Sequence, residues 1–258
     1  MKHIADAFER DKALIAYICA GDPTPDATTR IVHALIRAGA DLIELGLPFS
    51  DPIADGPTIQ AASQRSLQAG MNPDMFFDLV KTLPQTVPYA VMTYYNLIFH
   101  RGTMIFAKDC RNHGIGGIIV PDLPPEEADE LHEACKKYNL DLIHFIAPTT
   151  TPERIEHIIQ SSSGFIYLVA RLGVTGARET LEDRTKSLIQ RVHTDIPKAV
   201  GFGISNPQQA KEIINAGADG VIVGSAIVDI IARNTDDINK AVKEIETLTR
   251  KLKEGITR

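Results

Sequence analysis

Apolar residues gather into eight short runs that recur along the whole chain. The runs are continuous rather than alternating, which is typical of parallel strands buried on both faces. Segments with helical spacing separate them, and Ile31, Leu35 and Ala38 form the apolar stripe of one such segment. The pattern therefore predicts strands that alternate with helices. The predicted strands occupy residues 14–20, 42–47, 89–93, 115–120, 140–147, 165–170, 199–202 and 220–223.

Three of these strands follow a helical stretch that stops at a glycine, at Gly39, Gly114 and Gly217. Glycine ends helices readily because it accepts a positive φ. Eight strands alternating with helices, without a linker rich in Pro, Ser or Gly, predict an α/β fold in which residues 1–258 form a single (β/α)8 TIM barrel domain. An open doubly wound sheet uses the same alternation, but the eight regular units and the lack of an early GxGxxG loop favour the barrel.

Both ends of the chain add helices to this pattern. Residues 1–10 predict an extra N-terminal helix, with Ile4, Ala7 and Phe8 on one side. The last helix is expected from residue 226 to about residue 253, and residues 234–237 interrupt it and cap a new start.

Composition and charge mainly exclude certain classes of protein. The chain has 27 Lys+Arg against 33 Asp+Glu, and its longest basic cluster is Lys136-Lys137. Phosphate-backbone binding needs a concentrated basic face, which argues against nucleic acid as a main partner. No apolar run approaches the ~20 residues that span a bilayer. Three cysteines without a CxxC pair, and an N-terminus without a secretory apolar region, predict a cytoplasmic protein.

Two glycine-rich segments lie where barrel strands run into the following helix, which is where barrel active sites lie. Residues 201–205 follow the seventh predicted strand, and residues 224–226 follow the eighth. Free backbone N–H groups there, with the N-terminus of the helix that begins near Ser225, predict a phosphate-binding site. The alternative is that these glycines only form tight turns.

Two carboxyl groups are candidates for acid–base chemistry. Glu44 lies inside an apolar run, where burial without a partner would raise its pKa and suit it to proton transfer near neutral pH. A structural hydrogen bond or an arginine pair is the alternative. Asp55 lies in a long, proline-stiffened loop after the same strand. Because Asp-Gly is also an ordinary turn sequence, a turn-forming role stays open for Asp55.

A glycine-punctuated loop at residues 171–178 follows the sixth predicted strand, before helical character resumes near Arg184. The loop is long enough to act as a lid that excludes water, and a simple mobile loop is the alternative. The histidines are dispersed. His132 and Cys135 would share a helix face, but two groups are weak evidence for a metal site, so no metal is predicted.

Residues 44–60 resemble the signature segment of tryptophan synthase alpha chains. Further segments match the family in the same order along nearly the whole chain: residues 20–23, 94–96, 121–124, 173–176, 201–204 and 224–226. The segment at residues 44–60 is highly specific for the family, whereas those at residues 201–204 and 224–226 recur in many phosphate-binding barrels.

This resemblance implies a lyase of tryptophan biosynthesis that cleaves indole-3-glycerol phosphate into indole and glyceraldehyde 3-phosphate by a retro-aldol reaction. Glu44 would move protons at indole C3 and at the glycerol hydroxyl, and Asp55 would interact with the indole N–H. No cofactor is implied in this chain, because the indolenine tautomer of the substrate is the electron sink.

The resemblance also implies substrate contacts and a partner. Phosphate would bind at the glycines and the serine, and indole between the apolar side chains. The implied substrate-binding residues are Tyr94, Tyr167, Thr175, Gly176, Phe202, Gly203, Ile222, Gly224 and Ser225. Asp51, Pro52, Asp122 and Pro124 would face a pyridoxal-phosphate-dependent beta subunit in an alpha2beta2-type heterotetramer.

Two positions depart from the family pattern. Cys19 stands where members often carry threonine, and Ala170 where they often carry serine. These departures concern local hydrogen bonds rather than the reaction. Three alternatives to the lyase remain: another phosphate-sugar barrel isomerase or epimerase, an FMN-dependent oxidoreductase, and a non-catalytic subunit that only activates a beta partner. The pair of carboxyl groups favours the lyase.

Overall fold

The computed structural model describes residues 2–169, 181–201 and 203–257. Its strands form one parallel sheet in the order β5-β4-β3-β2-β1-β9-β8-β7-β6. Every strand lies within or overlaps one of the eight predicted runs. The strands are β1 (Ala13–Cys19), β2 (Leu42–Gly46), β3 (Tyr89–Met92), β4 (Gly117–Ile119), β5 (Asp141–Ile143), β6 (Phe145–Ile146), β7 (Ile166–Val169), β8 (Lys198–Gly201) and β9 (Gly220–Val223).

The two ends of this strand order are joined by a single residue, His144, which separates β5 from β6. β5 pairs with β4, and β6 pairs with β7. The backbone N–H of Tyr167 donates to the His144 carbonyl at 3.1 Å. β5 and β6 are therefore one barrel position interrupted at His144, and the predicted (β/α)8 TIM barrel is confirmed.

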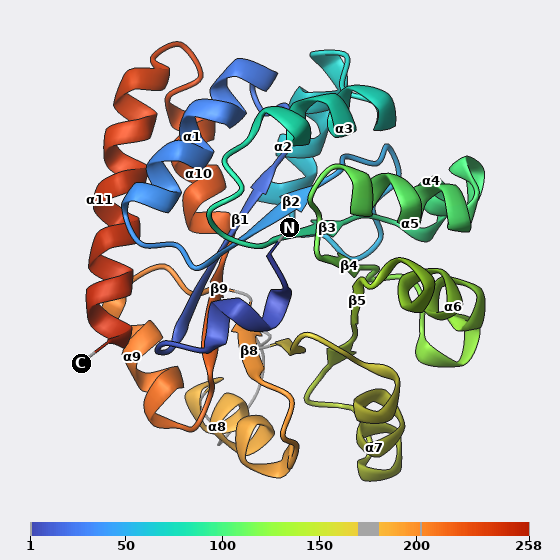
Figure 1. The fold of residues 1–258 in the computed structure, drawn as a ribbon. Helices are drawn as coiled ribbons and strands as arrows, with labels where there is room; N and C mark the ends of the chain where they lie inside the picture. Colours follow the sequence, from blue (N-terminus) through green and yellow to red (C-terminus); the bar gives the residue numbers. More distant parts are fainter. Residues whose placement is uncertain (1, 170–180, 202, 258) are drawn as a thin grey trace.

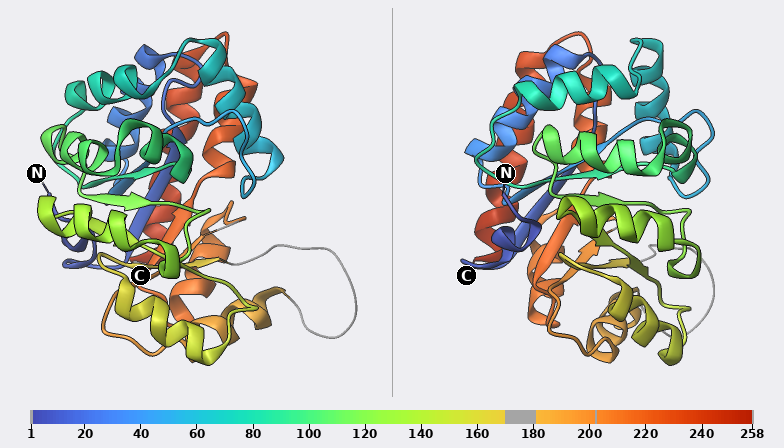
Figure 2. Two further views of the ribbon diagram at one scale, coloured as in Figure 1. Left: turned by 90° about the vertical axis from the view of Figure 1, so that its right-hand side faces the viewer. Right: turned by 45° about the vertical axis from the view of Figure 1, so that its right-hand side comes forward.

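The helices surround the strands (Figures 1 and 2). Four of them begin with an N-cap side chain followed by proline, at Thr24, Asn72, Thr151 and Asn206. The cap accepts a backbone N–H, and proline fits the first helical position because it has none to satisfy. The helices are η1 (Ile4–Phe8), α1 (Pro25–Arg37), α2 (Pro57–Gln68), α3 (Pro73–Thr82), α4 (Tyr95–Arg101), α5 (Thr103–Asn112), η2 (Pro125–Glu127), α6 (Asp129–Tyr138), α7 (Pro152–Ser161), α8 (Leu181–Arg191), α9 (Pro207–Asn215), α10 (Ser225–Arg233) and α11 (Ile238–Ile256).

Both faces of the strands are buried, which explains why the apolar runs are continuous. On β1 every residue is buried. Ile15 belongs to a cluster inside the barrel, with Leu42 and Ile222. Leu14 and Ile18 belong to the cluster between the sheet and the helices. Alternate residues of one strand thus enter different cores.

At both ends of the chain, the helices lie where the sequence predicts them, and the N-terminal one differs in helix type. The predicted N-terminal helix is a 3-10 helix, η1, in which Ile4 and Ala7 are buried. The predicted interruption at residues 234–237 separates α10 from α11, and the Asp237 side chain accepts the N–H of Lys240 at 3.1 Å. None of the described helices combines the length and apolar character needed to cross a membrane.

Two aspartates join neighbouring strands at the amino ends of the barrel strands. The carboxylate of Asp41 accepts the Leu14 N–H at 2.7 Å and the Lys253 ammonium at 2.7 Å. The carboxylate of Asp219 accepts the Lys198 N–H at 3.0 Å. Each aspartate comes two residues after a helix-ending glycine with positive φ. The repeated Gly-Ala-Asp pattern is therefore a structural device of this end.

Candidate active site

A cavity of about 260 Å³ opens at the carboxyl ends of the barrel strands. It brings together residues from six strands or the loops and helix starts that follow them, as expected for a barrel active site. Its lining consists of Tyr17, Glu44, Asp55, Gly56, Pro57, Thr58, Ile59, Met92, Tyr167, Gly203, Ile222, Gly224 and Ser225.

Glu44 lies in the middle of β2 and is 0% exposed. Among the described residues, neither of its carboxyl oxygens has a hydrogen-bond partner. Burial, and then the nearby charge of Asp55, raises the pKa of Glu44 to about 8. Because the ionised form is poorly solvated there, Glu44 holds a proton at neutral pH and can release it to a substrate. The alternative of a structural hydrogen bond or arginine pair finds no support in the described residues.

Asp55 lies on the loop between β2 and α2, and Tyr94 holds it. The Tyr94 hydroxyl donates to Oδ2 of Asp55 at 3.0 Å and accepts the N–H of Ala54 at 3.0 Å. The Phe49 ring packs on Tyr94 at 5.3 Å between centroids. Burial raises the pKa of Asp55, and the Tyr94 hydrogen bond counteracts that rise. Tyr94 contacts the carboxyl group rather than the cavity, which it does not line.

The loop that carries Asp55 continues into α2, whose first turn also lines the cavity. Gly56 is the N-cap and Pro57 the first residue of the helix. Thr58 and Ile59 lie beside Asp55 in the lining. Sequence reasoning did not single out these side chains, although their place directly after Asp55 was a usable signal.

The glycine-rich turns lie at one side of the cavity. Gly203, with φ +85°, follows β8, and Gly224 is the N-cap of α10, which starts at Ser225. All three line the cavity. The unpaired N–H groups of a helix N-terminus favour an anion there. Ile222 adds an apolar wall from β9.

Tyr167 lies inside the barrel on β7 and is buried. A Cβ at Gly201 of β8 would come within 2.6 Å of the Tyr167 hydroxyl. Glycine at residue 201 is therefore required for the tyrosine to occupy the cavity. Burial, followed by the charges of Glu44 and Asp55, raises the pKa of Tyr167 well above its ordinary value.

Tyr17 and Met92 are two lining residues that sequence reasoning missed. Tyr17 is the register partner of Glu44 on the adjacent strand. The apolar run that contains Tyr17 is continuous, so the pattern alone does not show which of its residues face the barrel interior. Only the pairing of β1 with β2 reveals that Tyr17 lies beside the catalytic candidate.

Some expected site residues lie outside the described residues. These are Thr175, Gly176 and Phe202, together with Ala170 and the expected lid at residues 171–178. In the described part of the chain, no group of three or more His, Cys, Asp or Glu side chains is arranged to hold a metal ion.

The four expected partner-facing residues lie on two loops that α4 joins. Asp51 is exposed and Pro52 partly exposed on the loop after β2. Asp122, after β4, accepts the Tyr95 N–H at 2.9 Å, and Pro124 follows it two residues later. Because the neighbouring Tyr94 holds Ala54, the start of α4 links both loops.

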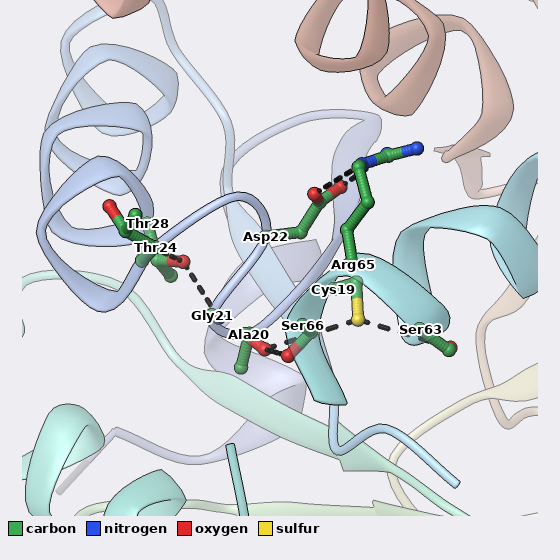
Figure 3. A network of polar contacts seen from close by, with 9 residues as sticks. All are labelled: Cys19, Ala20, Gly21, Asp22, Thr24, Thr28, Ser63, Arg65 and Ser66. Carbon is green, nitrogen blue, oxygen red and sulfur yellow. Dashed lines mark hydrogen bonds and ion pairs between the residues drawn. The ribbon is translucent and has the colours of Figure 1, made fainter. Parts of the chain in front are cut away.

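A polar network holds the β1–α1 turn against α2 (Figure 3). The Arg65 guanidinium of α2 donates two hydrogen bonds of 2.7 Å to the buried Asp22 carboxylate. Cys19 lies close by, with its sulfur 3.9 Å from the Ser63 hydroxyl and 3.9 Å from the Ala20 carbonyl. The thiol thus occupies a polar position of the kind a threonine hydroxyl would fill. Burial raises the pKa of Cys19 to about 12, so this thiol stays protonated.

Comparison with known proteins agrees with this geometry. Residues 4–257 match the profile of the family described as tryptophan synthase alpha chain. A tryptophan synthase alpha chain from Methanosarcina acetivorans is 55% identical, with 96% of this chain and 90% of the relative covered. The alpha chain of Natronomonas pharaonis is 50% identical, with 98% and 94% covered.

Solved structures agree as well. Tryptophan synthase subunit alpha from Legionella pneumophila superposes with a TM-score of 0.88 at 34% identity, covering 99% of this chain and 98% of that one. A chain of the tryptophan synthase complex from Pyrococcus furiosus gives a TM-score of 0.84 at 34% identity, covering 95% and 98%. The chain therefore belongs to the tryptophan synthase alpha chain family, the lyases that cleave indole-3-glycerol phosphate in tryptophan biosynthesis.

Proposed function

We propose that Glu44 and Asp55 perform the proton transfers of indole-3-glycerol phosphate cleavage in this chain. The observation that carries the proposal is the Glu44 carboxyl group, which is fully buried, lacks a partner among the described residues and lines the cavity together with Asp55. A carboxyl group that is uncharged at neutral pH can donate a proton, and its conjugate base can then accept one.

The reaction needs two proton movements. In the first, Glu44 gives its proton to indole C3 while the Asp55 carboxylate takes the proton of the ring N–H, which forms the indolenine. In the second, the Glu44 carboxylate takes the proton of the glycerol C3′ hydroxyl. The C3′ carbonyl then forms, the C3–C3′ bond breaks, and its electron pair returns to the ring, whose nitrogen regains its proton from Asp55. Indole and glyceraldehyde 3-phosphate result.

Asp55 acts at the ring nitrogen in this scheme. Positive charge develops at the indole N–H when C3 is protonated, and a carboxylate within reach stabilises that charge. The Tyr94 hydrogen bond favours the ionised form of Asp55 and fixes its orientation. The two carboxyl groups therefore act at different atoms of the indole ring, with Glu44 as the proton donor at C3 and Asp55 as the anion that accepts and returns the proton of the ring nitrogen.

The rest of the cavity suits the other parts of the substrate. The phosphate would bind the N–H groups at Gly203, Gly224 and Ser225, where the N-terminus of α10 favours an anion. The indole ring would lie against Ile222 and the other apolar lining, and Tyr167 beside the glycerol chain. This chain then needs no cofactor of its own, since the protonated ring accepts the electrons.

The partner would be a beta subunit that carries pyridoxal phosphate and receives indole, in an alpha2beta2-type heterotetramer. Two large apolar side chains support docking near the cavity mouth: Ile53 is 80% exposed and Phe99 is 66% exposed. Ile53 directly follows Asp51 and Pro52, and Phe99 lies on α4, which joins the two expected partner loops. We further propose that residues 1–258 act as one domain in the cytoplasm, with which the three buried free cysteines agree.

The test is release of indole from indole-3-glycerol phosphate, with and without a beta subunit, by wild type, Glu44→Gln and Asp55→Asn. Wild type is expected to cleave slowly alone and faster with the partner. Both variants are expected to lose at least about a thousandfold in kcat while substrate affinity stays within a few-fold, because the phosphate contacts remain. Near-normal turnover by either variant would contradict its assignment.

A further inference from the structure

The side chain of Tyr17 lies inside the catalytic cavity and has no place in the scheme above. It is 7% exposed, and its register partner on the neighbouring strand is Glu44. Side chains of paired residues on adjacent strands point to the same face, about 4.8 Å apart. Tyr17 and Glu44 therefore enter the barrel side by side.

Tyr17 is placed in the same way as Tyr167. On β1, Tyr17 leans along the strand so that its hydroxyl lies against Gly46, two residues beyond Glu44 on β2. On β7, Tyr167 leans toward Gly201, two residues beyond its own partner on β8. Any side chain at Gly46 would collide with the Tyr17 hydroxyl. Two tyrosine–glycine pairs thus place two hydroxyl groups in one cavity.

The Tyr17 ring also lies close to Gly224, one of the residues proposed to bind the phosphate. A Cβ at Gly224 would lie 3.2 Å from the ring. Tyr17 therefore packs between the start of α10 and the strand that carries Glu44, so its own position is fixed from both sides. Burial, Cys19 and the charges of Asp55 and Glu44 raise the pKa of Tyr17 well above its ordinary value, which keeps the hydroxyl a hydrogen-bond donor.

Two groups without hydrogen-bond partners in the described part of the chain enter one cavity from this pair of strands. Among the described residues, the Tyr17 hydroxyl has no hydrogen-bond acceptor. The oxygens of Glu44 equally have no donor there. Catalytic hydrogen bonds are often unformed in the free enzyme and tighten when substrate binds. A hydroxyl next to a carboxyl that must ionise during the reaction is suited to such a bond.

We propose that Tyr17 is a positioning residue for Glu44: its hydroxyl donates a hydrogen bond to the Glu44 carboxylate after the carboxyl group has given its proton to indole C3. The bond orients the carboxylate toward the C3′ hydroxyl, its next proton donor. This inference rests on the proposed role of Glu44. The other titratable groups that face Glu44 are Asp55 and Tyr167, which remain unchanged in the test.

The experiment compares kcat, KM and the pH profile of kcat for wild type, Tyr17→Phe and Glu44→Gln, each with the beta subunit. Tyr17→Phe removes only the hydroxyl and keeps the ring against Gly224. A hydrogen bond to the Glu44 carboxylate stabilises the ionised form that removes the C3′ hydroxyl proton. Its loss is therefore expected to reduce kcat about tenfold. KM should stay within twofold. The limb of the pH profile that belongs to Glu44 should move up by about one pH unit, since the ionised form loses its donor.

Tyr89→Phe is the matched control. Tyr89 is also a buried barrel tyrosine, but its hydroxyl donates to the Pro84 carbonyl at 2.6 Å, away from the cavity. This variant is expected to lose thermal stability and to keep the wild-type pH profile.

A Tyr17→Phe kcat within twofold of wild type, a rise in KM alone, or the same shift of the limb in Tyr89→Phe overturns the assignment of Tyr17. In each case the proposed role of Glu44 stands if Glu44→Gln is inactive. Turnover by Glu44→Gln overturns the proposed function itself.

Discussion

The two ends of the barrel treat their carboxyl groups in opposite ways. At the amino ends of the strands, the Asp41 carboxylate is matched by the Leu14 N–H and the Lys253 ammonium, each at 2.7 Å. Toward the carboxyl ends, the Glu44 carboxyl is fully buried without a partner among the described residues. Burial without compensation costs free energy. The first arrangement stabilises the fold, whereas the second gives up stability and leaves a reactive proton.

The contrast explains why the role of a carboxyl side chain cannot be inferred from its neighbours in sequence alone. Asp41 precedes β2 and Glu44 lies within it, three residues later. The Asp41 carboxylate, which joins two strands at their amino ends, is held by a backbone N–H and an ammonium group. A carboxyl group whose oxygens enter a cavity is available to a ligand. Glu44 is therefore distinguished from Asp41 by two features together, buried oxygens without a hydrogen-bond partner among the described residues and a place in the cavity lining.

The first prediction, with the largest expected effect, compares two variants that each lack one carboxyl group, one from each end of the barrel. Glu44→Gln should lower kcat by about a thousandfold or more, because general acid–base transfer is lost. Asp41→Ala, three residues away in sequence, should leave kcat within twofold at a temperature where the variant is folded. Steady-state indole release measures both. Comparable losses in the two variants would contradict the division between the ends.

The second prediction concerns stability against pH. The unfolded Glu44 ionises at its ordinary pKa of 4.5, whereas the folded barrel raises that pKa to about 8. Between these values the folded state binds more protons than the unfolded state. The free energy of unfolding should therefore fall as pH rises, by up to about 1.4 kcal/mol per pH unit from this group alone.

Glu44→Gln removes that dependence. The free energy of unfolding of Glu44→Gln minus that of wild type should be near zero at pH 4.5. This difference should grow as pH rises and become constant above about pH 8. Chemical denaturation of both proteins across this range measures the difference. A constant difference at every pH would show that Glu44 is not forced to hold its proton.

Much of this molecule could be predicted from its amino-acid pattern, and the parts that could not have physical reasons. The run that contains Glu44 predicted a buried carboxyl group, because strand length and apolar neighbours leave a side chain no route to water. Tyr17 was missed because a strand buried on both faces shows no alternation. The break at His144 was missed because the apolar run continues through it, and only the pairing of β5 and β6 with different neighbours shows it.

The third prediction concerns how much Asp41 stabilises the amino ends of the strands. Asp41→Ala leaves the Leu14 N–H without its side-chain acceptor and Lys253 without its carboxylate. An unmatched backbone donor costs about 1–3 kcal/mol, so the free energy of unfolding should fall by about that amount. Denaturant titration measures it. Arg37→Ala is a suitable control, since its ion pair with Glu246 is more exposed and should contribute less than about 1 kcal/mol.

The fourth and smallest expected effect tests how Asp55 is held. Tyr94→Phe removes the hydroxyl that donates to Asp55 and accepts the Ala54 N–H. The pKa of Asp55 should rise further, because the hydrogen bond that opposes the rise is lost. We expect kcat to fall about tenfold. In Tyr95→Phe, where the contact to Asp122 comes from the backbone, kcat should stay within twofold. Equal kcat values for the two variants would argue against Tyr94 as the support of Asp55.

The central claim is that Glu44 is an uncharged carboxyl group at neutral pH, and its pKa can be measured directly. Carbon-13 chemical shifts of the glutamate carboxyl groups, followed from pH 4 to pH 9, give the titration of each group, and the signal absent from Glu44→Gln belongs to Glu44. We expect that signal to titrate with a midpoint near 8. A midpoint near 4.5 would mean that the carboxylate is ionised in the resting enzyme, and Glu44 could not be the donor that starts the cleavage.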